Sequence, residues 1–222
     1  MCGRFVVFSD LKDIQRAFDI PATQTEVKPS YNVAPTHQVY VVVQRAGANA
    51  LETMRWGLIP SWAKDEKIGS RMINARAESV AEKPSFKRSL QKRRCLVIAD
   101  GFYEWHTEDG KKTPMFIRLK TDEPIGFAGL YDTWKSPDGE EITSCTIITT
   151  SANSMMQKIH ERMPVILSKE AQKTWLDPEI QDVEKLVALL KPYSADKMQA
   201  YPVSPQVNSP KNNSAELIKS AK

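Results

Sequence analysis

Cys2 follows the initiator methionine directly, and this position gives it chemistry that no internal cysteine has. Removal of Met1 by a methionine aminopeptidase would leave a free α-amine and a thiol on adjacent carbons. Both groups react near neutral pH, since their reference pKa values are about 7.7–8.0 and about 8.5. The amine can condense with an aldehyde to an imine that the thiol closes to a thiazolidine. Alternatively, the thiol can attack an acyl carbon while the amine takes its proton. A cysteine can also stand here simply by accident of the start codon.

Two further side chains could move protons. The segment DGFYEW (residues 100–105) alternates, and in a strand Phe102, Glu104 and His106 would share one face. Glu104 would then be a carboxylate among aromatic rings, where desolvation raises the pKa toward a value useful for proton transfer. The alternative is an ordinary carboxylate on a strand surface. His160 follows an expected helix in a proline-terminated turn, which favours an exposed imidazole over a purely structural one.

Groups that could bind a ligand occur in three other stretches. INARAE (73–78) offers an amide at Asn74 and a guanidinium at Arg76. RWGLIPSW (55–62) places two tryptophans among Gly and Pro, where aromatic rings either cover the core or stack on exposed bases. The basic run over residues 83–94 is either a solvated face or a phosphate contact.

Length and composition limit the class of protein. The 222 residues suit one large domain or two small ones, and the net charge of +4 permits a polyanionic partner without requiring one. Three widely spaced cysteines argue against a disulfide framework, and three separated histidines argue against a metal site. No apolar run approaches the roughly 18–20 residues of a membrane span, and the start lacks a signal-peptide layout. We therefore expect a cytoplasmic protein with no membrane partner.

Short strands dominate the expected secondary structure. They cover residues 3–8, 39–43, 51–55, 95–99, 114–119, 125–134, 141–150, 165–167 and 201–203, with hairpin turns at Asp109-Gly110 and at 136–139. Helices are expected after an N-cap at Ser9, over 151–158, after an N-cap at Ser168 and over 183–190. This pattern predicts an α+β fold, a single domain over residues 1–222 with a curved, barrel-like mixed β-sheet core flanked by short helices.

Six ordered motifs together point to one family. They are MCGRF at the start, YNVAP (31–35), RWGLIPSWA (55–63), INARAE (73–78), DGFYEW (100–105) and IHERMPVIL (159–167). The combination resembles the SOS-response-associated peptidase family, the abasic-site-processing proteins that crosslink to damaged single-stranded DNA. The resemblance spans essentially the whole chain, although no single motif would identify the family.

The resemblance implies a role for each matching residue. Cys2 would form the thiazolidine with the ring-opened aldehyde of an abasic site, and Asn74 would orient the deoxyribose and the cysteine. Glu104 would assist proton transfer, and His160 would lie beside the sugar hydroxyls and the 3′ phosphate. The expected DNA-binding residues are Arg4, Asn32, Pro35, Trp56, Arg76 and Arg162. Among these, the arginines would hold phosphates and Trp56 would belong to the surface beside the lesion.

The function implied is an abasic-site sensor that shields the lesion through a covalent Cys2 thiazolidine once Met1 has been removed, with the crosslink either an end point or a reversible intermediate. The family name implies autopeptidase removal of Met1, and the imine also permits lyase-type β-elimination. We expect a monomer that binds single-stranded DNA carrying an abasic site, uses no metal or organic cofactor, and works at the nucleoid near replication-fork proteins. Two alternatives stay open. One is an N-terminal-nucleophile glutamine amidotransferase, which also begins Met-Cys-Gly, and the other is a non-catalytic single-strand binding module.

Overall fold

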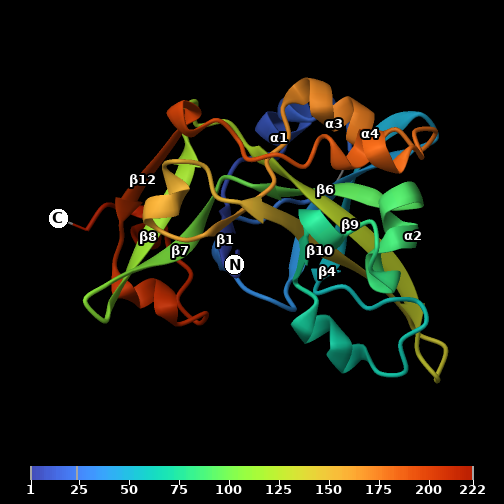
Figure 1. Ribbon diagram of the computed structural model, residues 1–222, viewed down its shortest axis with the longest axis horizontal. Coiled ribbons are helices and arrows are strands. Elements are labelled where there is room, and N and C mark those ends of the chain that lie inside the picture. The colour runs from blue at the N-terminus through green and yellow to red at the C-terminus, as the bar shows by residue number, and fades with distance from the viewer. Residues whose placement is uncertain (1, 24, 222) are drawn as a thin grey trace.

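Five strands close into a barrel at the centre of the computed structural model, which describes residues 2–23 and 25–221 (Figure 1). In barrel order they are β3 (Gln38–Arg45), β4 (Ala48–Trp56), β10 (Glu141–Ser151), β9 (Ile125–Lys135) and β6 (Arg94–Ala99), and β6 pairs again with β3. The sheet is mixed, because β4 and β10 run parallel while the other barrel pairs are antiparallel. Two short strands extend β10: β5 (Asn74–Arg76) runs parallel to it and β11 (Arg162–Pro164) antiparallel.

A second, antiparallel sheet packs against the barrel. Its order is β12 (Met198–Pro202), β8 (Lys111–Leu119), β7 (Gly101–Glu108), β1 (Phe5–Val7) and β2 (Ser30–Val33). Strand alternation sends Phe5 and Phe102 into the main core, where both rings meet Phe127 of β9 edge-on at centroid distances of 6.1 and 5.9 Å. Val6 and Tyr103 point to the opposite face, into a smaller core covered by C-terminal residues. β1 and β7 are direct neighbours, with Phe5 opposite Phe102.

Two-residue turns with positive φ close two of the hairpins. Ala46-Gly47 (φ 48° and 82°) joins β3 to β4, and Asp109-Gly110 (φ 48° and 77°) joins β7 to β8. Such turns match the right-handed twist of the strands they connect. The predicted turn at Asp109-Gly110 is confirmed, although β8 begins at Lys111 rather than at residue 114.

The α-helices lie outside the sheets (Figure 1). They are α1 (Leu11–Ala17), α2 (Pro84–Lys92), α3 (Lys169–Leu176) and α4 (Val183–Val187). Ser168 caps α3, as predicted. The cap predicted for α1 is wrong: Asp10 accepts from a first-turn N–H at 2.8 Å, because the Ser9 hydroxyl donates instead to the buried Asp100.

Three further segments differ from the sequence-based expectation. The sequence pattern does not predict α2. This helix buries Phe86 and Leu90, one helical turn apart, beneath its basic residues. The helix expected over 151–158 is only the 3₁₀ turn η3 (Met156–Lys158), because the Asn153 side chain accepts from the N–H groups of residues 155 and 156. The strand expected at 165–167 is shifted to β11. The other 3₁₀ turns are η1 (Glu66–Arg71), η2 (Ala77–Ser79), η4 (Ala195–Lys197), η5 (Pro205–Asn208) and η6 (Ala215–Ile218).

The predicted fold class is confirmed as an α+β fold with a barrel-like mixed sheet and short helices. The long strand β10 organises it, since β9 and β11 pair along one edge and β4 and β5 along the other. Over the described residues, no helix has the length and apolar character needed to cross a membrane.

Candidate active site

Cys2 lies in the short segment that leads into β1, and none of its surface is exposed. Asn74, the first residue of β5, donates from Nδ2 to the Cys2 carbonyl oxygen at 2.8 Å. The backbone N–H of Arg4 lies near enough to the Cys2 thiol to lower its pKa slightly. Burial raises the pKa of this thiol far above its ordinary value, and the charge of nearby Glu104 raises it further. The thiol is therefore held in place in its neutral form and needs a base before it can act as a nucleophile.

Glu104 is a buried carboxyl group on the core-facing side of β7, with 3% of its surface exposed. It follows Phe102 at the spacing of one strand face and lies opposite Met115 of β8. Burial raises the pKa of Glu104 from its ordinary 4.5 to about 7. Both protonation states are populated near neutral pH, which is the condition for general acid–base catalysis. The structure thus excludes the alternative of an ordinary surface carboxylate.

His160 lies at the same end of β10 as Asn74. Ile147 of β10 pairs with Asn74 on one edge, and Ser151 pairs with Arg162 on the other. The half-buried His160 ring accepts the Arg162 backbone N–H at Nδ1, at 3.0 Å, and burial lowers the pKa of the imidazole. A neutral ring that accepts at Nδ1 carries its proton at Nε2, so His160 offers a hydrogen-bond donor there.

The three predicted phosphate ligands differ in exposure. Arg76 is exposed, whereas Arg4 and Arg162 are half-buried. Arg162 forms a bidentate ion pair with Glu78, at 2.6 and 2.9 Å, and also donates to the Thr149 carbonyl at 2.7 Å. That pairing lowers the pKa of the Glu78 carboxyl. Arg162 can therefore reach a phosphate only in competition with Glu78, while Arg76 already faces outward.

Two of the predicted DNA-binding side chains, Asn32 and Trp56, are buried, which corrects the expectation that Trp56 belongs to the surface beside the lesion. Asn32 is 1% exposed, and its amide nitrogen lies within hydrogen-bond distance, 2.8–3.3 Å, of three backbone carbonyls of the C-terminal segment. Trp56 is 0% exposed; Nε1 donates to the Ile73 carbonyl at 2.9 Å, and its ring lies 5.0 Å from that of Phe5. Pro35 is half-buried in the turn after β2 and keeps a partly accessible ring.

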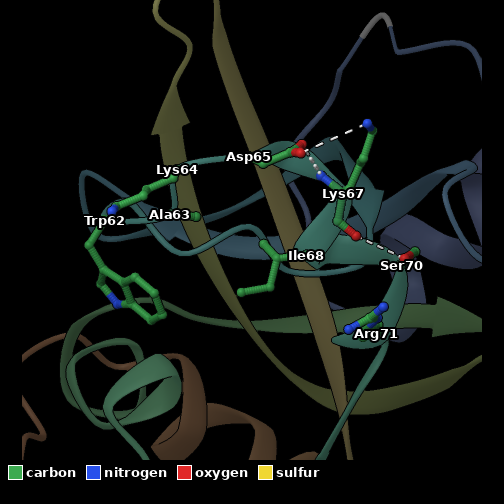
Figure 2. Close-up of a pocket in the computed structure, with 8 residues that line it drawn as sticks. All are labelled: Trp62, Ala63, Lys64, Asp65, Lys67, Ile68, Ser70 and Arg71. Atoms are coloured by element: carbon green, nitrogen blue, oxygen red, sulfur yellow. Dashed lines mark hydrogen bonds and ion pairs between the residues drawn. The ribbon is translucent and has the colours of Figure 1, made fainter.

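The second tryptophan of the same motif, Trp62, is the exposed one, with 59% of its surface accessible. Figure 2 shows it at one end of a pocket with Ile68 near the centre and Arg71 at the far side, while Lys64 and Lys67 border the pocket. An aromatic face beside three cations suits a stacked base and its phosphates. The sequence indicates which of the two tryptophans is exposed. Trp56 continues the inward alternation of β4, whereas Trp62 follows Pro60 beyond the end of the strand.

The remaining cysteines are part of the core. Cys95 and Cys145 are fully buried free thiols on β6 and β10. Over residues 2–23 and 25–221, no three His, Cys, Asp or Glu side chains gather closely enough to hold a metal ion.

Comparison with known proteins matches residues 1–210 to one family, described as SOS response associated peptidase (SRAP). The chain is 53% identical to the abasic site processing protein YoqW of Bacillus subtilis, over 99% of this chain and 100% of that one. It is 34% identical to the abasic site processing protein HMCES of the mouse, over 86% of this chain and 64% of that one. A crystal structure of a protein from Bacteroides thetaiotaomicron superposes with a TM-score of 0.89 at 28% identity, covering 100% of both chains. The resemblance inferred from the motifs is confirmed: the chain belongs to the SOS response associated peptidase (SRAP) family.

Proposed function

We propose that the protein processes abasic sites in single-stranded DNA by forming a covalent thiazolidine through Cys2. The observation that carries the proposal is the buried group formed by Cys2, the Asn74 amide that holds its carbonyl, and Glu104 with a pKa of about 7. Relatives named as abasic site processing proteins, one of them 53% identical over almost the whole chain, support the choice of substrate.

The chemistry needs proton transfer at each step. An abasic deoxyribose exposes its aldehyde only in the open-chain form, and we assign the proton transfer of ring opening to Glu104. The Cys2 α-amine then attacks C1′, and loss of one water gives the imine. The thiol adds to the imine carbon and its proton moves to the nitrogen, which closes the thiazolidine. Glu104 can return a proton to the ring nitrogen or sulfur, so the same residue supports reversal.

The α-amine must be free for this reaction. A retained Met1 would turn the amine into an amide and block thiazolidine closure. We propose that the protein hydrolyses the Met1–Cys2 bond itself; Met1 lies outside the described residues. The imine also acidifies the C2′ hydrogens, so loss of one of these protons with departure of the 3′ phosphate provides the lyase-type branch.

The DNA would lie across the exposed cations near Cys2. We assign phosphate contact to Arg76, which is exposed, and to Arg162 after exchange of Glu78 for a phosphate. His160 would donate from Nε2 to the sugar or the 3′ phosphate. Trp62 with Lys64, Lys67 and Arg71 would hold a flanking nucleotide by stacking and charge.

The proposal is tested with single-stranded DNA that carries one abasic site, beside intact DNA of the same sequence. A shifted band on a denaturing gel is expected with the abasic DNA only, and it should vanish with Cys2→Ala. An adduct that survives Cys2→Ala, or no adduct at all, would reject the proposal. Glutamine hydrolysis by the same preparation would instead support an amidotransferase.

A further inference from the structure

Arg4 connects the Cys2 thiol to two other parts of the fold. Its backbone N–H lies near the thiol, two residues away along the chain, and its carbonyl accepts from the N–H of Tyr103 at 2.9 Å, one residue before Glu104. Its side chain turns inward, where Nη1 donates to Asn32 Oδ1 at 2.7 Å and to the Val207 carbonyl at 2.9 Å. A single residue thus contacts the nucleophile, the strand of the acid–base group and the C-terminal part of the chain.

Asn32 is the centre of this connection. Its Oδ1 accepts from Arg4, and its Nδ2 faces the carbonyls of Val207, Ser209 and Asn212 at 3.3, 3.0 and 2.8 Å. An amide nitrogen has two hydrogens, so these three acceptors already exceed its donor capacity. Every polar atom of the Asn32 side chain therefore serves the interior of the protein, and its role lies in holding other groups.

Residues 205–213, which we call the C-terminal clasp, are the part of the chain to which Asn32 and Arg4 bind. Val207 is fully buried in the smaller core beside Tyr103. Trp105 donates from Nε1 to Asn208 Oδ1 at 2.8 Å, and Asn213 Oδ1 accepts from the backbone of β2 at 2.6 Å. The clasp is thus attached to β7 and to β2, on either side of β1.

We propose that Arg4 and Asn32 are positioning residues that hold the Cys2 thiol in place by fastening the segment before β1 to the C-terminal clasp. A chain end frays unless specific contacts hold it. Here Asn74 holds the Cys2 carbonyl, and the Arg4 side chain fastens the chain two residues further on to Asn32 and to the clasp. The positioning of Cys2 by these residues can be measured without DNA. The effect of that positioning on crosslinking rests on the proposed function.

A DNA-free experiment tests the placement directly. Wild type, Arg4→Met, Asn32→Ala and Arg76→Met are treated with iodoacetamide, and the rate at each cysteine is followed by peptide mass spectrometry. Cys95 and Cys145 are fully buried in the barrel and report unfolding of the whole protein. Arg4→Met loses two side-chain hydrogen bonds, and Asn32→Ala loses the bond from Arg4 together with those to the clasp. We expect each variant to raise the Cys2 rate about tenfold, with no change at Cys95 or Cys145. Arg76→Met should leave all three rates unchanged.

Crosslinking separates positioning from phosphate binding. The rate is measured at saturating abasic DNA, and non-covalent affinity is measured for each variant in a Cys2→Ser background. Arg4→Met should slow the saturated rate about tenfold with little loss of affinity, whereas Arg76→Met should lower affinity and reduce the slope of log affinity against log salt by about one. Asn32→Ala should match Arg4→Met, and the double variant should be no slower than either single variant.

Each outcome decides one question. If Arg4→Met leaves Cys2 as slowly alkylated as wild type and only weakens DNA binding, Arg4 is a phosphate ligand and the positioning role is wrong. If the wild type forms no crosslink while Arg4→Met still exposes Cys2, the positioning stands and the proposed function fails. If Asn32→Ala raises the rate at all three cysteines, it has unfolded the protein, and Arg4→Met, at a half-buried position, then tests the positioning role by itself.

Discussion

Replacing Glu104 with glutamine should stabilise the protein at neutral pH, and the size of this effect follows from the burial of the carboxyl group. Glutamine keeps the shape of glutamic acid but never ionises. In the wild type, the pKa of Glu104 rises from 4.5 to about 7 on folding because the charged form is desolvated. At about 1.36 kcal/mol per pKa unit, ionisation of the folded protein carries a penalty of about 3 kcal/mol.

The sign of the effect sets the pH window. Below pH 4.5, Glu104 is protonated in both the folded and the unfolded chain, so it contributes no penalty. Between pH 4.5 and about 7 the unfolded chain loses the proton while the folded one keeps it, so wild-type stability falls as the pH rises. In Glu104→Gln, the unfolding free energy does not show this fall with pH. Its advantage over the wild type should grow from near zero to about 3 kcal/mol and then stay constant.

Urea unfolding of both proteins at pH 4.5, 6 and 8 measures this difference, and other titrating groups cancel in the comparison. Glu104→Gln should also form the thiazolidine more slowly, because the amide cannot transfer the proton. A difference in unfolding free energy that is flat across this range would show that folding does not shift the pKa of Glu104. The acid–base role assigned to it would then lose its physical basis.

Substitutions at three other positions, Asn74, Trp62 and Trp56, test the remaining assignments. Asn74→Ala removes a hydrogen bond to the Cys2 carbonyl worth about 1 kcal/mol and should slow crosslinking roughly fivefold at saturating DNA. Asn74→Asp also lacks the N–H donor and should slow crosslinking by the same factor. A wild-type rate in Asn74→Asp would reject the role of this hydrogen bond. Trp62→Ala should weaken binding of single-stranded DNA by about 1–3 kcal/mol per stacked base, with unchanged urea stability. Trp56→Ala should instead lower the unfolding free energy by about 3–5 kcal/mol, and the opposite pattern in the two tryptophans would refute their assignment to pocket and core.

Local sequence patterns predicted those parts of the fold that local physics determines. The Asp109-Gly110 turn needs only a pair of residues that accept positive φ, and the burial of Glu104 follows from its alternation with Phe102. The same reasoning missed α2, because its charged residues obscured the Phe86 and Leu90 pair that faces the core. Charge alone does not show whether a basic stretch is a loop or one face of a helix.

Contacts between distant parts of the chain explain the other differences. The motif resemblance assigns Asn32 to DNA binding, but the Val207 carbonyl that it binds lies 175 residues further along the chain. No pattern around residue 32 indicates that partner. The burial of Trp56 could be predicted in part from the sequence. Its pairing with Cys145 of β10, a distant contact, fixes the end of β4 in the core. Strand phase alone would have favoured Trp62 as the exposed ring.

The intact mass of the protein–DNA adduct tests the central claim most directly. A Cys2 thiazolidine predicts the mass of the protein without Met1 plus that of the abasic DNA, less one water, with no borohydride needed to trap it. Peptide mapping should place the DNA on residue 2. An adduct that retains Met1, that requires reduction to survive, or that maps to a lysine would contradict the account.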